Sequence, residues 1–206
     1  DKFNYTMHVL NILASFHFLK KYIIKIIVGS DYPFKKELMQ KLKDLNLKTI
    51  LIDNPTNLAN EIAECKFAIG AGGVSLLERS SLAVPSIVYP VAENQKHICN
   101  EYDNRKLGFV IKKGESDEVS KLKSAVKVFI NEKQLSFKSA ANKDFIDARG
   151  TNRTILQLFK EFNFLDFYDA TKEDVEFIFN CRYTATNSSF YLSSDVPSFQ
   201  SHKDWF

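Results

Sequence analysis

The sequence predicts an α/β fold in which a parallel sheet carries helices on both faces. Short β-branched runs alternate with amphipathic stretches between residues 20 and 110. The runs are mostly apolar, as in strands that are buried on both faces, and show no regular alternation with polar residues. A glycine-rich turn joins one of these runs to the stretch that follows it. Together these features indicate a Rossmann-like domain.

Each element follows from its own pattern. A helix is expected at residues 6–21, ahead of the first strand. Strands are predicted where the runs are apolar or β-branched, at residues 22–30, 47–53, 66–70, 85–90 and 108–112. Helices are predicted between them, where apolar residues recur with helical spacing, at residues 33–45, 55–65, 73–83 and 94–107. Pro33 is favourable near the first turn of the helix expected at residues 33–45.

The chain becomes mainly helical after Gly114. Helices are expected at residues 116–132, 133–146 and 151–162, with Ser116 capping the first of them. The apolar face of that first helix comprises Val119, Leu122, Val126 and Phe129.

The alternation of strand and helix restarts at residue 163. A strand at 164–171 and a helix capped by Thr171 are expected there. A unit of some 40 residues is too short to bury its own core without support. Two domains are therefore predicted, at residues 1–162 and 163–206.

Composition narrows the class of protein. The chain has 206 residues, is 45% hydrophobic and carries 28 basic against 25 acidic residues, which are interleaved. This pattern gives no basic stripe for nucleic acid. Cys65, Cys99 and Cys181 lack the spacing of a zinc site or a disulfide framework. No apolar run reaches the roughly 18 residues of a membrane span, and no signal peptide is evident. We therefore expect a cytoplasmic protein without a metal, and the missing initiator Met indicates that Asp1 is a cut end.

The glycine-rich turn is the strongest candidate for a ligand site. The stretch "FAIGAGGVSLLERSSLAVPSIVYPVAENQ" places Gly70, Gly72 and Gly73 between a strand and a helix, although the chain has only 7 glycines. Such turns let backbone N–H groups approach phosphate oxygens at a helix N-terminus. We expect Gly70 and Gly72 to adopt dihedral angles closed to other residues, Gly73 to permit close approach, and Ser75 to add a hydroxyl. From spacing alone, a tight turn needed only for packing is an equally open interpretation.

Two further groups of polar residues follow the turn. Glu78, one helical turn on, has the geometry to bind two vicinal ribose hydroxyls, whereas an ion pair with Arg79 or a lysine is the simpler alternative. Glu93, Asn94 and Gln95 stand at the next strand end, where ligand binding and plain N-capping are both open.

Other residues that could carry chemistry are assigned to structure. Tyr89 and Tyr102 are expected in the core. The histidines stand in no triad-like or metal-like context and are interpreted as surface or packing residues: His8, His17, His97 and His202. No nucleophile or general base is evident.

The same residues resemble a known family. "AIGAGGVSLLERSSLAVPSIVYPVAENQ" is similar to the C-terminal half of the UDP-sugar hydrolases of the pseudaminic acid pathway, which are relatives of MurG-type glycosyltransferases. "IDARGTNRTI", Ile146 to Ile155, resembles the family's D-G-x-G-x-x-R segment, with Ala148 in place of the first glycine and Gly150 retained. The likeness covers about residues 1–162.

This resemblance implies a fold, a ligand and a reaction. The fold is the C-terminal domain of the glycosyltransferase B type, and the ligand is UDP, bound at Gly70–Gly73, Glu78 and Glu93–Gln95. The reaction is attack of water on the anomeric carbon of a UDP-diacetamido-trideoxyhexose, with release of UDP and without a metal. The catalytic histidine belongs to an N-terminal half whose G-x-G-H motif is missing here, so the catalytic residues are not identified and this chain is expected to bind nucleotide without turnover.

The last residues resemble a second family. Residues 164–206 are similar to the start of a GNAT-type N-acetyltransferase acting on amino-sugar nucleotides, with matches at Ala170, Thr171, Asp174, Phe199, His202, Trp205 and Phe206. The turn that binds pyrophosphate in such enzymes is missing, so acetyl-CoA is expected only for a longer fused domain. Two alternatives remain open: a MurG-like glycosyltransferase with an acceptor, and a non-catalytic Rossmann-like module that supports the acetyltransferase.

Overall fold

The computed structural model describes residues 3–162, which fall into two compact units. The first unit ends at Asp147. The second begins at Ala148, and its described part is helix α8 (Gly150–Phe162). The predicted domain boundary at residue 162 falls at the limit of the described residues and stays a prediction. The expected strand at 164–171, the helix capped by Thr171 and the acetyltransferase-like matches lie outside them.

The strands of the first unit are all paired in parallel, which confirms the predicted α/β class. Strand β1 (Ile23–Val28) pairs with β2 (Lys48–Asp53). Three further strands form a second ladder in the order β3-β4-β5: β3 (Ala68–Ala71), β4 (Ser86–Tyr89) and β5 (Phe109–Val110). The single sheet expected from the sequence is thus divided in two. Side-chain packing joins the two parts, since Ile24 of β1 and Ile69 of β3 pack against the same hydrophobic cluster.

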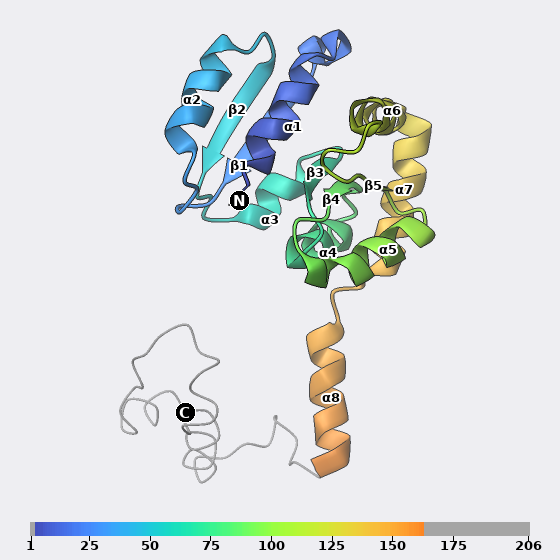
Figure 1. Cartoon of the computed structure of the whole chain (residues 1–206). Helices are drawn as coiled ribbons and strands as arrows, with labels where there is room; N and C mark the ends of the chain where they lie inside the picture. The colour runs from blue at the N-terminus through green and yellow to red at the C-terminus, as the bar shows by residue number, and fades with distance from the viewer. Residues whose placement is uncertain (1–2, 163–206) are drawn as a thin grey trace, which may run out of the picture. The chain divides into compact units, whose positions relative to one another are not determined.

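Helices follow the strands in the predicted alternation (Figure 1). Among the described residues, the helices after the first four strands are α2 (Lys35–Asp44), α3 (Leu58–Ala63), α4 (Val74–Ser81) and α5 (Lys96–Asn104), the last preceded by the 3₁₀ turn η2 (Glu93–Gln95). After β5 come α6 (Glu118–Ile130) and α7 (Glu132–Phe145). No helix within residues 3–162 is both long enough and apolar enough to cross a membrane.

Two local predictions are wrong. The helix expected at 6–21 is α1 (Tyr5–Ala14) followed by the 3₁₀ helix η1 (His17–Lys21). Ser15 ends α1 because both its N–H and its hydroxyl bond to the carbonyl of Ile12, and Phe16 then turns into the core with 2% of its surface exposed. Ser116 is not the cap of α6, which begins after Asp117. The carboxylate of Glu118 instead accepts a bond from the N–H of Gly114, 2.7 Å away, and fixes the preceding loop.

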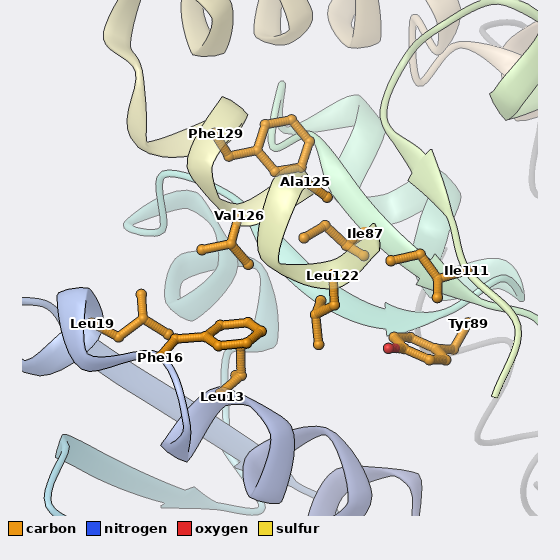
Figure 2. Packing of buried hydrophobic residues seen from close by; sticks show 10 residues of the cluster. All are labelled: Leu13, Phe16, Leu19, Ile87, Tyr89, Ile111, Leu122, Ala125, Val126 and Phe129. Carbon is orange, nitrogen blue, oxygen red and sulfur yellow. The ribbon is translucent and has the colours of Figure 1, made fainter. Parts of the chain in front are cut away.

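The main hydrophobic cluster covers one face of β4 (Figure 2). Ile87 and Tyr89 point into it from the strand, and α6 supplies Leu122 and Phe129. Val88, which lies between those two strand residues, belongs to a different cluster. This second cluster also contains residues of α4 and α5 and is flanked by α7: Leu76, Cys99, Tyr102, Ala141 and Phe145. Successive strand residues face opposite sides of a sheet, so helices cover β4 on both faces.

Helix α1 packs against both parallel ladders. Its Leu13 lies in the cluster around β4, whereas Leu10 lies in a third cluster with Ile26 of β1 and Leu38 of α2. Leu10 and Leu13 are three residues apart, close enough on a helix to face neighbouring surfaces. Helix α1 therefore joins β1 and β2 to the rest of the unit.

Candidate functional site

The glycine-rich turn lies where the sequence predicts, at the carboxyl end of β3. The strand ends at Ala71, Gly72 and Gly73 make the turn, and α4 begins at Val74. Gly73 provides no side-chain cap, and Val74 is 73% exposed. The first N–H groups of a helix have no partner within it, so this uncapped end offers backbone donors at the edge where parallel sheets bind ligands.

Close packing, and not a special backbone angle, requires the glycine at position 72. Among the described residues, Gly114 is the glycine with positive φ, so the expectation of special dihedral angles at Gly70 and Gly72 is wrong. A Cβ atom on Gly72 would lie 2.2 Å from the Sγ of Cys99 on α5, a distance that real atoms do not reach. Gly72 therefore allows α5 to pack directly beneath the turn.

The second polar group meets the turn in space. A Cβ atom on Gly73 would lie 3.4 Å from the Nε2 of Gln95. The Oε1 of Gln95 accepts a bond from the N–H of Val91 at 3.0 Å, which holds the side chain in place. Residues from two consecutive strand-to-helix turns thus form one surface, as predicted from their positions after neighbouring strands.

Glu93 and Asn94 are placed less favourably for a ligand. Both are exposed, and Glu93 forms an ion pair with Lys96 at 2.6 Å. Neither caps a helix, because the N-cap positions of η2 and α5 carry no side-chain hydrogen bond. N-capping, the simpler alternative, is therefore wrong, and a role in binding stays a prediction for these two residues.

Glu78 is not the partner of Arg79. Its side chain is exposed, and among the described residues it has no ion pair. Glu78 and Ser75 are three residues apart on α4 and so lie on one face of the helix. A free carboxylate and a hydroxyl therefore stand side by side, one turn from the glycines.

Arg79 is a residue of this site whose position the sequence did not reveal. It is 7% exposed and makes three hydrogen bonds, from Nε to the Ser86 Oγ at 2.8 Å, from Nη1 to the Ser75 Oγ at 3.2 Å, and from Nη2 to the carbonyl of Ala71 at 2.8 Å. Burial lowers its pKa, while the nearby carboxylate of Glu78 opposes this effect. Its spacing of four from Ser75 was the available signal, because such residues are neighbours on a helix.

The tyrosines and the histidine described next have structural roles. Tyr89 and Tyr102 are buried, as expected. His8, interpreted as a surface or packing residue, joins α1 to α6 through its Nε2, 2.7 Å from the Oε1 of buried Glu118. Within residues 3–162 no group of His, Cys, Asp or Glu is arranged to hold a metal ion.

Two hollows lie elsewhere on the unit. One of about 330 Å³ lies at the carboxyl end of β1 and is lined by residues that include Gly29, Asp31 and Tyr32. Another of about 350 Å³ lies between β5 and α6, where Val110 and Lys121 contribute to its wall. Neither is lined by residues of the glycine-rich turn, so the candidate site is not inside either of them.

Comparison with known proteins adds little to this geometry. No family model and no curated protein matches the sequence. Among solved structures, the chain is similar to the crystal structure of WaaG, a glycosyltransferase involved in lipopolysaccharide biosynthesis, with 15% identity and a TM-score of 0.48. The match covers 62% of this chain and 34% of that one, so the chain spans about a third of its length. A similarity of this size identifies no substrate or reaction. It also lends no support to the finer resemblances, to pseudaminic-pathway hydrolases and to acetyltransferases.

Proposed function

We propose that the first unit binds the nucleoside diphosphate part of a nucleotide sugar, as one half of a glycosyltransferase-like enzyme. One observation carries this proposal: two consecutive strand-to-helix turns meet at the carboxyl edge of the β3-β4-β5 ladder, with Gly73 against Gln95. This edge is where nucleotide phosphates bind in parallel α/β domains. The uncapped start of α4 supplies the donors that a phosphate needs.

Each side chain of the site then has a part in binding. The hydroxyl of Ser75 donates to a phosphate oxygen, beside the amides of the turn. The carboxylate of Glu78, exposed and unpaired within the described residues, accepts hydrogen bonds from the two ribose hydroxyls. The Nε2 of Gln95 is a further donor, because its Oε1 is already engaged by Val91. UDP is the nucleotide that the sequence resemblance suggests.

We propose the chemical step that hydrolysis and glycosyl transfer have in common. Nucleoside diphosphate leaves the anomeric carbon in both, and either water or an acceptor hydroxyl attacks. Hydrolysis in nonulosonic acid biosynthesis is suggested by the sequence resemblance alone, whereas the similar solved structure is that of a glycosyltransferase. Incubating the intact protein with UDP-sugar and no acceptor distinguishes them, since only hydrolysis then releases free sugar and UDP together.

Calorimetric titration of this chain with UDP tests the binding site. We expect binding with a Kd below about 1 mM, and a loss of tenfold or more in Glu78→Ala, because hydrogen bonds to a charged group contribute about 1.5–3 kcal/mol. Glu132→Ala is the matched control, since Glu132 is an exposed helical glutamate on α7. A 2′,3′-dideoxy analogue of UDP isolates the ribose contact and should bind the parent chain and Glu78→Ala equally. No binding at millimolar UDP, or equal binding of UDP by both chains, would refute the proposal.

A further inference from the structure

The guanidinium of Arg79 ties three elements together beneath the glycine-rich turn. Its three bonds reach the last residue of β3, the first turn of α4 and the first residue of β4, through Ala71, Ser75 and Ser86. A Cβ atom on Gly70 would lie 3.1 Å from Nη1, so the group lies directly against the turn. Arg79 therefore holds the turn from behind.

This buried charge has no carboxylate bonded to it within the described residues. An arginine remains protonated even where burial lowers its pKa, as it does here. Buried charges are normally paired, because removing an ion from water is costly. Within residues 3–162 no carboxylate lies within ion-pair distance of Arg79, and the acceptors of its bonds are two hydroxyls and a carbonyl. Glu78 acts on Arg79 only through space, without a direct bond, so no carboxylate occupies the guanidinium itself.

The same bonds orient the groups that a phosphate would meet. The Ala71 carbonyl points to Nη2, so its negative end is turned inward and away from the side where an anion would sit. The Ser75 oxygen accepts from Nη1, which leaves its own hydrogen to donate elsewhere. Among the described residues, the Ser75 hydroxyl donates no hydrogen bond.

A chain of buried polar groups holds Arg79 itself in place. The N–H of Ser86 donates to the hydroxyl of Tyr102 at 2.9 Å, and that hydroxyl donates to the Oδ1 of Asn142 at 3.0 Å. Ser80, next to Arg79, donates to the same oxygen at 2.9 Å. Helices α4, α5 and α7 are therefore linked to Arg79 and Ser86, beneath the turn, through buried hydrogen bonds.

We propose that Arg79 is a positioning residue for a diphosphate at the glycine-rich turn, because it turns the Ala71 carbonyl inward, frees the Ser75 hydroxyl to donate and places a buried positive charge behind the turn. This inference rests on the proposed function, in which the anion is the diphosphate of a nucleotide.

The test uses inorganic pyrophosphate as the anion and uridine as the neutral part of the nucleotide. Both are titrated into this chain by calorimetry, together with UDP. Arg79→Met should weaken pyrophosphate binding by about tenfold or more, the size expected for a lost charge-assisted contact, and Arg79→Lys by less, because lysine keeps the charge but not the fork of donors. Uridine affinity should change less than about twofold in both. Arg105→Met is the matched control, since Arg105 is an exposed arginine that ends α5, and it should bind all three as the parent does.

Ser75→Ala keeps the test decisive if Arg79→Met does not fold. It removes the oriented hydroxyl and leaves the buried charge, so pyrophosphate binding should fall several-fold while uridine binding is retained. Unchanged pyrophosphate affinity in Ser75→Ala and Arg79→Lys overturns the proposal. So does an equal loss of pyrophosphate and uridine in the Arg79 variants, which marks a merely structural role.

The parent chain separates this inference from the proposed function. If it binds pyrophosphate through Arg79 but neither uridine nor UDP, the role of Arg79 stands and nucleotide binding fails. If it binds UDP and not pyrophosphate, nucleotide binding stands and the role of Arg79 is overturned. If it binds neither, both fail.

Discussion

Replacing Gly72 by alanine adds one methyl group at the point where the glycine-rich turn meets α5. The new Cβ would lie 2.2 Å from the Sγ of Cys99 and 3.1 Å from a methyl group of Val88, whereas ordinary contacts begin at 3.4 Å. Cys99 and Val88 are buried, with 2% and 0% of their surface exposed. The turn and α5 must therefore move apart by more than about 1 Å.

The loss of stability expected for Gly72→Ala comes from the contact of the new methyl group with Cys99. Forcing an extra methyl group into a packed core costs about 1–3 kcal/mol, so Gly72→Ala should lower the free energy of unfolding by that amount. Cys99→Ala removes the sulfur that the methyl group would strike. In that background Gly72→Ala should cost at least about 0.5–1 kcal/mol less, which is a coupling of the size seen between contacting residues.

Urea unfolding followed by far-UV circular dichroism measures the four free energies of this cycle. Gly29→Ala is the control, because a Cβ atom there would meet nothing within 4 Å, and it should change stability by less than about 1 kcal/mol. An equal cost of Gly72→Ala in both backgrounds would refute the packing argument. The parent and the double variant should also bind UDP more alike than the parent and Gly72→Ala.

Two further predictions concern buried polar groups. Asn142→Ala removes the Nδ2 donor from the carbonyls of Leu107 and Lys138, so it should lower the free energy of unfolding, measured in urea, by about 2–4 kcal/mol. The control is Asn100→Ala at an exposed position, which should change this free energy by less than about 0.5 kcal/mol. Equal effects of the two substitutions would contradict the buried hydrogen-bond network. For Glu118, burial alone would raise the pKa, but the bonds from the Gly114 N–H and from His8 outweigh it and hold the pKa below its ordinary value of 4.5. A lowered pKa in the folded state stabilises the fold above the ordinary value, and this contribution is lost as the pH falls through the folded value. The parent should therefore lose stability between about pH 5 and pH 3 more steeply than Glu118→Gln, and parallel pH profiles in urea unfolding would count against it.

The order of elements was predictable because it depends on neighbouring residues. The apolar run at 22–30 and the spacing of Leu122, Val126 and Phe129 are local patterns, and the structure places a strand and a buried helical face there. Helix ends were harder. Ser116 has the chemistry of a cap, but the loop before α6 is held by Glu118, whose bond to Gly114 depends on how that loop is folded.

Some features of the candidate site were likewise predictable from the sequence, and others were not. Its position at the carboxyl end of β3 and the meeting of the turn with Gln95 follow from the rule that neighbouring parallel strands end at one edge. The reason for its glycines did not follow, since Gly72 is needed because Cys99 packs against it from another helix. The ion pair between Glu78 and Arg79, the simpler alternative at the sequence level, does not form, because the Arg79 guanidinium is buried and donates hydrogen bonds to Ser86 and Ala71.

The class of fold, the alternation of strands and helices and the place of the candidate site could be predicted from the spacing of apolar residues and glycines along the chain. The folded structure was needed to show that the backbone pairing divides into two ladders and that, within the described residues, Glu78 forms no ion pair and Arg79 is buried with no carboxylate bonded to it. Those features depend on contacts between residues far apart in sequence, and such contacts exist only once the helices have packed on the strands.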